Sequence, residues 1–435
     1  MFFSSLLDLG RGHRPGREFM FTWIKIAFRN LCKNRRRSFF TILAIGLGYA
    51  AVNVFGGFTA YIFTSLRDGY IYALGSGHLT IFKKGFLTRG KLSPVHYLLS
   101  AAETQSIKEV LQGFSGVVLV TPQLHISGLL SNGEVSTIFI AAGRVPSDLR
   151  AINSHAQGTI GRLNLYTGKP LEDDIPYGIG LSSGLAEQLQ LNLDSNAVAM
   201  APTVSGQINA LDVQVFQIFD SAIEVLNDKL MSVPLAFAQS LYDTSSVDRL
   251  TVLLNDTEQT EPMRAALTHA FAQHGLDVEV KTWQELAILY NKVKDMFDII
   301  FLFIFVIVFI IAMMSVINTI SMAVMERIRE IGTLRAVGVK RNGIVHLFAI
   351  ESAMLGLFGS MVGIGLTLIS WIIVRVLEPS WMPPIITQRL PLEIHLVPEY
   401  VLLSIPLLVI LSVGAASFPA RRAAHQSIVD ALGHA

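Results

Sequence analysis

The densest group of residues that could bind a partner or support chemistry lies in the stretch MERIREIGTLRAVGVKRNGIVHLFAI, from Met325 to Ile350. Apolar residues recur at helical spacing in and just before it, which predicts a charged helix with one apolar face. They are Val324, Ile328, Ile331, Leu334 and Val337, and the charges between and after them are Glu326, Arg327, Arg329, Glu330, Arg335, Lys340 and Arg341. An apolar face must lie against a surface, which we interpret as the surface of another protein.

A solvated loop bound to lipid headgroups is the alternative interpretation of this stretch. Glu326 and Glu330 argue against it, because an anionic leaflet repels carboxylates. The stretch is also longer than a tight turn between two membrane spans requires.

Patterns typical of enzymes are missing from the sequence. The nearest approach to a G-x-x-x-x-G-K-[ST] phosphate loop, Gly338 to Gly343, lacks both the spacing and the hydroxyl residue. His269 and His274 are five residues apart and so do not share a helical face, and no G-x-S-x-G elbow is present. We therefore expect a non-catalytic chain that binds no metal and no cofactor, and does not hydrolyse nucleotide by itself.

Composition indicates a membrane protein. Of the 435 residues, 51% are hydrophobic and 15% are charged, against about 25% charged in soluble domains, and the mean hydropathy is +0.49. The net charge of +1 gives no reason to expect nucleic acid as a partner. The single cysteine, Cys32, excludes a disulfide framework within one chain.

Four apolar segments are long enough to cross a hydrocarbon core of about 30 Å. Basic residues precede the first and third spans and follow the second and fourth, so all four clusters fit one side, which the positive-inside rule makes the cytoplasm. We expect a bacterial inner-membrane protein with both termini cytoplasmic and a large periplasmic domain. The expected segments are 1–38 (cytoplasmic, with an amphipathic helix), 39–63 (first span), 64–296 (extracytoplasmic domain with stalk helices), 297–317 (second span), 318–346 (cytoplasmic coupling segment), 347–377 (third span), 378–399 (outer loop), 400–418 (fourth span) and 419–435 (cytoplasmic tail).

The fold class is thus predicted as membrane α-helical, with four transmembrane helices and a large mixed α/β extracytoplasmic domain between the first and second. Within that domain the sequence predicts strands at 78–82, 117–120 and 135–141, with a hairpin turn at 132–133. A strand, helix and strand follow at 250–254, 261–274 and 278–280. Residues 1–19 are expected to be dispensable, because Met20 could be an alternative start.

Several residues at membrane depth are candidates for helix contacts. Gly46 and Gly48 in the first span, and Gly359 and Gly363 in the third, are small residues that let helices approach closely. We favour packing of the third-span pair against the fourth span over a dimer contact. Asn53 indicates an interhelical hydrogen bond or a cavity lining, with the first favoured.

Glu351 lies about one turn inside the third span, where pairing with a nearby arginine is favoured over a proton relay.

Three separated motifs carry a resemblance to a known family: IKIAFRNLCKNRRRSFFTILAIGLGYAAV, MERIREIGTLRAVGVKRNGIVHLFAIESAMLGLFGSMVGIGL and PARRAAHQSIVDAL. Together they resemble the FtsX-like, MacB-type permeases of ABC transporters, the mechanotransmission or type VII class. The domain between the first two spans is similar to that of the family only in its position in the chain and in its general pattern of turns, strands and short helices. Thr282 and Trp283 resemble the lipoprotein-releasing branch.

The resemblance implies a permease dimer, homomeric or heteromeric, with two copies of a cytoplasmic ABC ATPase that binds the ATP and Mg. It also implies contact with membrane lipid and, in some members, with a periplasmic membrane-fusion or carrier protein. The residues that match the family's coupling motif are Glu326, Arg327, Arg329, Glu330, Gly332, Leu334, Arg335, Ala336 and Gly338.

The expected function is transmission of ATPase-driven motion to lipoprotein, lipid-anchored or other hydrophobic cargo on the periplasmic side. A MacB-like efflux permease and an FtsX-like signal transmitter to a cell-wall hydrolase are the alternatives. A rigid helix from Gln284 to Gly338, with a possible kink at Gly332, would connect the two sides as a lever, since 55 residues extend about 80 Å.

Overall fold

The computed structural model describes residues 17–90, 93–156, 166–221, 224–381 and 389–428, with side chains from Trp23 onward. The expectation about an N-terminal extension thus falls largely outside the described residues, as do the middle of the expected outer loop and the end of the tail. The chain divides into two compact units. Unit 1 comprises 1–61, 295–378 and 392–435, and unit 2 comprises 62–294 and 379–391.

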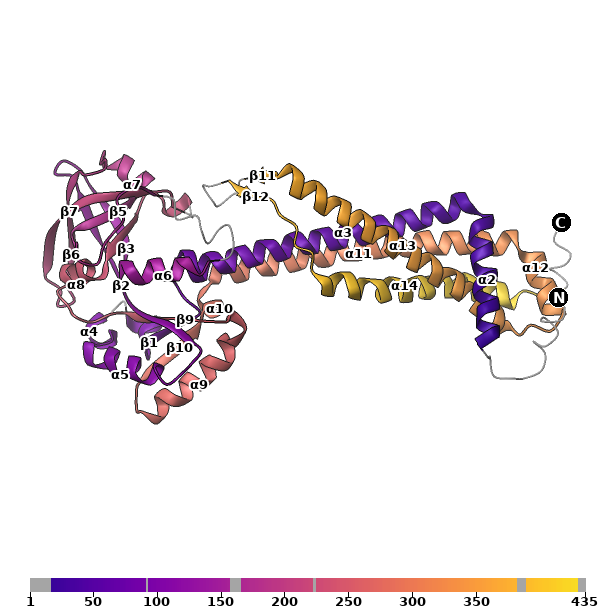
Figure 1. Ribbon diagram of the computed structural model, residues 1–435, viewed down its shortest axis with the longest axis horizontal. Helices are drawn as coiled ribbons and strands as arrows, with labels where there is room; N and C mark the ends of the chain where they lie inside the picture. The colour runs from indigo at the N-terminus through magenta and orange to yellow at the C-terminus, as the bar shows by residue number, and fades with distance from the viewer. Residues whose placement is uncertain (1–16, 91–92, 157–165, 222–223, 382–388, 429–435) are drawn as a thin grey trace. The chain divides into compact units, whose positions relative to one another are not determined.

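Unit 1 is built from helices (Figure 1). Among the described residues, four helices are long and apolar enough to cross a membrane. The helices that contribute to the unit are α2 (Arg17–Lys33), α3 (Arg35–Asp68), α11 (Ile288–Glu326), α12 (Ile328–Ala336), α13 (Arg341–Leu377) and α14 (Pro398–His425). The four long ones, α3, α11, α13 and α14, include the four apolar segments found in the sequence.

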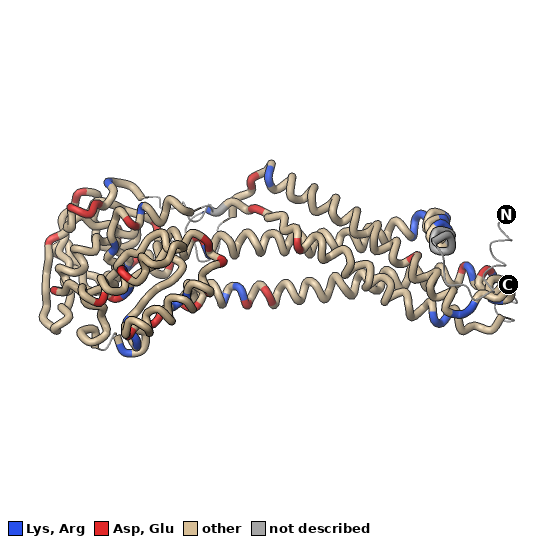
Figure 2. The backbone as a smooth tube through the Cα atoms, turned by 60° about the horizontal axis from the view of Figure 1, so that its bottom comes forward, with Lys and Arg blue, Asp and Glu red and all other residues tan. Residues whose placement is uncertain are grey.

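Charged residues are nearly absent from the middle of the long helices and gather at their ends (Figure 2). Many Lys and Arg residues lie at the end where α2 and α12 are found, because α2, the start of α3, α12 and the end of α14 are all basic there. This is the distribution expected for helices with their apolar middle in lipid and their charged ends in water.

The core of unit 1 combines side chains from all four long helices with residues of α12. It includes Ile45 of α3, Val316 of α11, Phe348 of α13 and Ala416 of α14, each at most 1% exposed. Many core positions on α14 are alanine, which lets α13 and α14 pack closely along their length.

The glycines of the third span pack against a different helix from the one expected. A Cβ added to Gly359 would lie 2.5 Å from Cγ2 of Ile45, and one added to Gly363 would lie 2.6 Å from the side chain of Tyr49. Both neighbours belong to α3, so the expectation that this pair packs against the fourth span was wrong. It is Gly356 that faces α14, where the nearest atom is Oγ of Ser412 at 2.8 Å.

Unit 2 contains a ten-stranded sheet, part of which closes on itself. The order β10-β1-β9-β2-β3-β8-β5-β7-β4 continues through β6, which pairs with both β2 and β7, so six strands complete a barrel. The strands are β1 (Leu79–Lys83), β2 (Val117–Ser131), β3 (Ser136–Arg144), β4 (Tyr166–Gly168), β5 (Gly178–Ser182), β6 (Asn196–Pro202), β7 (Ile208–Phe219), β8 (Leu230–Pro234), β9 (Arg249–Leu254) and β10 (Val278–Thr282).

The helices of unit 2 cover two separate cores. One core fills the barrel and includes residues of α7 (Ser183–Gln188) and α8 (Leu235–Tyr242); the other lies where α5 (Ala101–Leu111) and α9 (Thr260–Gln273) pack on β1, β9 and β10. Shorter helical segments are η2 (Gly69–Ala73), η3 (Phe86–Gly90), α4 (Pro94–Tyr97), α6 (Pro146–Ser154), η5 (Glu224–Leu226), η6 (Thr257–Gln259) and α10 (Trp283–Leu286), and β11 (Ser380–Trp381) pairs with β12 (Leu390–Pro391).

The strands and the helix expected from sequence in this region are confirmed within a few residues. β1, β3, β9, α9 and β10 lie where the patterns predict them, and β2 and β3 form the expected hairpin around residues 132–133. β2 is much longer than predicted, because it continues through Pro122, Gln123 and Gly128, residue types that do not favour strands. The barrel strands β5 to β8 were not predicted.

The single rigid helix expected from Gln284 to Gly338 is interrupted at two positions. Ala287 separates α10 from α11, and Arg327, with φ −118° and ψ 19°, separates α11 from α12. The kink considered at Gly332 is absent, since that residue lies inside α12. α11 itself has 39 residues, which extend about 60 Å at about 1.5 Å per residue.

Candidate functional site at the junction of α11 and α12

The coupling residues expected from sequence lie on α12 and on its two ends. α12 begins after Arg327, whose carbonyl accepts a hydrogen bond from the amide of Ile331 at 2.9 Å. It ends before Gly338, which adopts a φ of +107° that side chains with a Cβ rarely adopt. The amide of Val339 then returns to the carbonyl of Leu334 at 3.0 Å and closes the helix end.

α12 has a packed face and a free face. Ile328, Ile331 and Gly332 are buried against the bundle, so the expectation that the apolar face lies on another protein was wrong: most of that face packs within this chain. The exposed residues Arg329, Thr333, Ala336 and Val337 follow the spacing i, i+4, i+7 and i+8 and form the free face, whereas Glu330, also exposed, accepts from Arg327. Leu334 and Arg335 lie between the two faces. Val337 is 47% exposed, so the free face has an apolar end.

A buried ion pair holds the start of α12 to α13. Nη1 of Arg327 lies 2.9 Å from Oε1 of Glu351, and the side chains are 12% and 3% exposed. Nδ2 of Asn30, on α2, donates to the same carboxylate oxygen, and Nε of Arg327 donates to Glu330 at 2.9 Å. Because a buried charge is costly unless it is paired and hydrogen-bonded, this cluster ties three helices to the junction.

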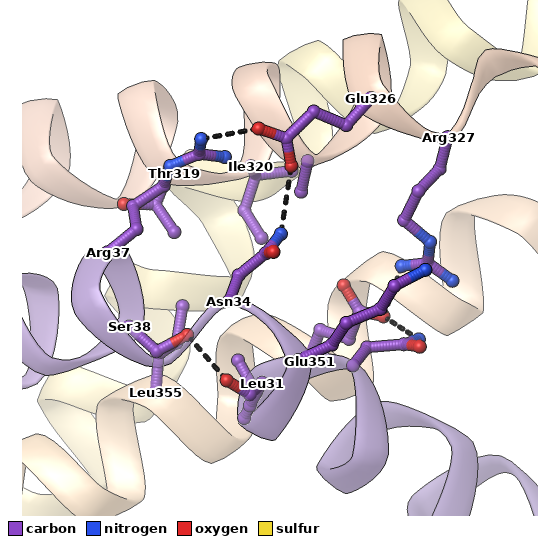
Figure 3. A pocket seen from close by; sticks show the side chains of 13 residues that line it. Leu31, Asn34, Arg37, Ser38, Thr319, Ile320, Glu326, Arg327, Glu351 and Leu355 are labelled. Carbon is purple, nitrogen blue, oxygen red and sulfur yellow. Dashed lines mark hydrogen bonds and ion pairs between the residues drawn. The ribbon is translucent and has the colours of Figure 1, made fainter.

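A second pair connects the start of α3 to the end of α11. Nη2 of Arg37 lies 2.6 Å from Oε1 of Glu326, and Nδ2 of Asn34 donates to the other oxygen at 2.9 Å (Figure 3). Lys33 approaches Glu330 only to 3.7 Å, with both side chains mostly exposed, so this contact contributes little. The carboxylates of Glu351 and Glu326 therefore each accept hydrogen bonds from one arginine and one asparagine.

A small cavity of about 100 Å³ lies between the two pairs (Figure 3). Nη1 of Arg37 is buried and has no hydrogen-bond partner among the described residues. The lining side chains come from α2, α3, α11 and α13 and from Arg327. They are Asn30, Leu31, Lys33, Asn34, Arg37, Ser38, Thr319, Ile320, Ala323, Glu326, Arg327, Glu351 and Leu355.

The structure separates the nine sequence-predicted coupling residues into two groups. Five are exposed, of which Glu326 is paired with Arg37, and four are buried or half-buried. The exposed residues are Glu326, Arg329, Glu330, Ala336 and Gly338, and the others are Arg327, Gly332, Leu334 and Arg335. Nη1 of Arg335 donates to the carbonyl of Gln426 after α14, so this residue also fastens α12. The ion pair expected for Glu351 is present, with Arg327 as the partner.

Sequence reasoning missed the contribution of α2 and α3 to this site. The partners of Asn30, Asn34 and Arg37 lie about 290 to 320 positions away in the sequence. In the sequence, the basic residues of this segment indicated only the orientation of the first span in the membrane. It also missed Thr333 and placed Val337 on the packed apolar face, although Val337 is 47% exposed; helical spacing from Arg329 could have identified both as exposed.

The remaining helix-contact candidates lie between the long helices. Gly46 faces Val362 of α13 with a Cβ distance of 3.0 Å, and Gly48 faces Val308 of α11 at 2.7 Å. Asn53 donates from Nδ2 to the carbonyl of Tyr49 at 2.9 Å and to Ser404 of α14 at 3.4 Å. The favoured interhelical hydrogen bond is therefore present, although it is long.

Comparison with known proteins shows similarity to a family of permeases. Residues 302–428 match the family described as FtsX-like permease C-terminal. An uncharacterized ABC transporter permease from Methanocaldococcus jannaschii is 24% identical over 351 residues, which cover 78% of this chain and 81% of that protein.

Two further relatives have more specific names. The lipoprotein-releasing system transmembrane protein LolC from Neisseria meningitidis is 24% identical over 60% of this chain and 63% of its own length. The macrolide export ATP-binding/permease protein MacB from Hyphomonas neptunium is 27% identical over 32% of this chain and 22% of its own length.

Among solved structures, the periplasmic region of MacB from Actinobacillus actinomycetemcomitans matches 49% of this chain and 91% of that one, at a TM-score of 0.36 and 18% identity. In sequence, residues 302–428 thus match an FtsX-like permease domain, and the chain is similar to proteins named ABC transporter permease, LolC and MacB.

Proposed function

We propose that this permease transmits the motion of a separate cytoplasmic ATPase across the inner membrane, to act on lipoprotein, lipid-anchored or other hydrophobic cargo on the periplasmic side. The observation that carries the proposal is the division of α12 into a free face and a face that is fastened to the bundle. A helix with this division can bind a partner on one side and pass force to the membrane helices on the other.

The free face of α12 is the proposed ATPase contact. Arg329, Thr333, Ala336 and Val337 combine one charge, one hydroxyl and an apolar end, which is the mixed composition typical of protein interfaces. ATP and Mg would be bound by the partner, in two copies per permease dimer, and this chain would bind no cofactor. MacB relatives, whose name includes an ATP-binding part, extend well beyond the matched region.

The fastened face is the proposed route of force. Arg327 connects α12 to Glu351 of α13, and Arg335 connects it to the end of α14. Through Glu326 the end of α11 is connected to Arg37 of α3. α11 then continues without a break to Ile288, which belongs to unit 2. A movement of α12 would therefore be felt by each of the four long helices.

The orientation follows from the basic residues. Most Lys and Arg residues of unit 1 gather at the end where α2 and α12 lie, and such residues are retained in the cytoplasm. Both termini would then be cytoplasmic, and unit 2 would be periplasmic.

A second permease subunit and membrane lipid would cover the long helices. In α11 only 11% of the most apolar window is buried within this chain, compared with 39% in α3. Its outward side chains include Leu302, Phe303 and Ile310. This apolar surface is suited to lipid and to a like or unlike partner permease.

The cargo assignment is supported by the relative named for lipoprotein release, which matches 60% of this chain. The alternatives are an efflux permease that works with an outer-membrane duct, and a signal transmitter to a cell-wall hydrolase. The test that separates them is to purify the tagged chain from native membranes and identify the bound proteins and lipids by mass spectrometry. A periplasmic lipoprotein carrier favours the first function, a membrane-fusion protein the second and a hydrolase the third.

Two classes of variant then test the coupling mechanism in the purified complex. Val337→Asp, on the free face, is expected to release the ATPase. Combined replacement of Glu330 and Arg335 by Gln is expected to keep the ATPase bound but to separate ATP turnover from cargo release, because Arg335 fastens α12 to the end of α14 and Glu330 accepts from Arg327, which joins α12 to α13. Arg29→Ala, at an exposed position of α2, is the control and should leave both unchanged. Normal assembly and normal cargo release in both classes would exclude α12 as the coupling element.

A further inference from the structure

We propose that the cavity beside the α11–α12 junction binds the phosphate group of a phospholipid from the leaflet in which α2 lies. Its geometry is independent of the proposed ATPase coupling, and the proposal requires only that the long helices span a bilayer.

The first argument is the balance of hydrogen-bond donors and acceptors in the cavity. Glu326 is occupied by Arg37 and Asn34, and Glu351 by Arg327 and Asn30. What remains is a donor, because Nη1 of Arg37 is buried without a partner among the described residues. A buried donor of this kind costs free energy until an acceptor reaches it.

The second argument is charge. Three cationic side chains line the cavity, namely Lys33, Arg37 and Arg327, against the two carboxylates. The lining therefore has a net charge of +1, and both carboxylates are already paired. The repulsion of an anion by Glu326, which argues against lipid contact when the sequence is considered alone, is largely cancelled here by Arg37. An anionic oxygen donor such as a phosphate diester would complete the charge balance.

The third argument is the distribution of polar and apolar lining. The apolar lining residues Ile320, Ala323 and Leu355 belong to the membrane helices α11 and α13, whereas Lys33 and Asn34 lie where α2 meets α3. A single bound water needs about 10–15 Å³ of such space, so a cavity of about 100 Å³ is several times too large for one water. An amphiphile, with an anionic group beside an apolar stem, matches both sides of this lining.

The fourth argument is the position of α2. It is basic at Lys25, Arg29 and Lys33, and it exposes the apolar side chains of Ile24 and Phe28 at 41% and 50%. These properties are typical of a helix that lies in the interface of a membrane. Asn30, Leu31 and Lys33 at the end of this helix line the cavity, so a lipid beside α2 would be adjacent to it.

The test measures lipid retention by native mass spectrometry of the full chain, extracted from nanodiscs that contain phosphatidylglycerol. Arg37→Gln removes the donor charge and should weaken retention of one phosphatidylglycerol about 10- to 100-fold, the effect of losing hydrogen bonds to a charged group. Arg36→Gln is the matched control, because Arg36 is exposed, adjacent and absent from the lining. Equal loss in both variants would mean general attraction of the basic segment and would overturn the proposal.

A second pair of variants leaves every charge in place. Ala323→Leu adds three carbons inside the cavity and should displace the lipid, whereas Ser321→Leu adds similar volume to α11 outside the lining. Retention unaffected by Ala323→Leu would place the lipid elsewhere. This comparison also keeps the proposal testable if Arg37→Gln does not fold.

The source of the phosphate is tested by adding inorganic phosphate at millimolar concentration to lipid-depleted protein. We expect phosphatidylglycerol, but not inorganic phosphate, to raise the thermal unfolding midpoint of the wild type more than that of Arg37→Gln. Equal stabilisation by inorganic phosphate would assign the cavity to a soluble anion and overturn the lipid assignment. Because no readout uses ATP turnover, failure here is distinct from failure of the coupling proposal.

Discussion

Arg327 reaches the carboxylate of Glu351 at 2.9 Å, although Arg327 lies in the break between α11 and α12 and Glu351 is buried inside α13. This contact fixes the direction in which α12 leaves the bundle. Removal of one partner from such a buried pair is costly, because it leaves the other charge without compensation.

We expect Glu351→Ala to lower the free energy of unfolding by about 3 kcal/mol, the usual cost of removing one partner from a buried ion pair. Glu330→Ala removes the other acceptor of Arg327 but should cost less than about 1 kcal/mol, since Glu330 is 55% exposed. Thermal unfolding of both variants in the same detergent provides the measurement. Similar midpoints for the two variants would show that the pair with Glu351 is not a principal contact of the junction.

Gly57 is a site where even one added carbon should disturb unit 1. A Cβ there would lie 2.3 Å from the carbonyl oxygen of His395, whose amide donates to the carbonyl of Gly57 at 3.1 Å. Gly57→Ala should therefore destabilise unit 1 by about 1–3 kcal/mol through overpacking. Gly365→Ala on α13 is the matched control, because an added Cβ meets no atom within 4 Å among the described residues. If the two variants unfold at the same temperature, residues 392–397 do not pack on α3 as described.

His78 should make unit 2 sensitive to mild acid. It is fully buried, Nδ1 accepts from the amide of Leu254 at 3.1 Å, and Nε2 contacts Oγ1 of Thr257 at 3.0 Å. Burial, with a smaller effect of the Arg67 charge, lowers the pKa of His78 to about 4. The unfolded chain takes up this proton near its ordinary pKa of 6.5, so stability is complete above that pH and falls by about 3 kcal/mol as the pH drops toward 4.

Replacement of His78 by Gln should reduce this dependence between pH 6.5 and 4, and part of the remaining slope comes from His125, whose pKa is also lowered by burial. His274→Gln, at an exposed histidine of the same unit, should retain the slope of the wild type. Asp248 does not contribute in this window. Burial alone would raise its pKa, but His125 and Arg249 hold the pKa at about 2. The stability that the charged carboxylate of Asp248 contributes is therefore lost only below about pH 4. Unfolding midpoints at half-unit pH steps measure the slopes, and identical slopes for wild type and His78→Gln would contradict the assignment.

The elements that the sequence predicted correctly are those whose signal comes from residues close together in the sequence. Long apolar runs predict α3, α11, α13 and α14, and the alternating strand pattern predicts β1 and β3, because hydropathy and side-chain period act within a few residues. Strands β5 to β8 of the barrel were missed; in β6, for example, the inward positions are the small residues Ala197, Ala199 and Ala201, which give a weak pattern.

By itself, the sequence determined the four apolar helices, the clustering of basic residues at their ends and the presence of a charged amphipathic helix after the second. Only the tertiary structure decided that α11 breaks at Arg327, that Gly359 and Gly363 face α3, and which face of α12 is free. The reason is physical. Contacts such as Arg37 with Glu326 join residues 289 positions apart, and in lipid the choice of partner helix depends on close packing of small residues and on buried polar pairs rather than on hydropathy.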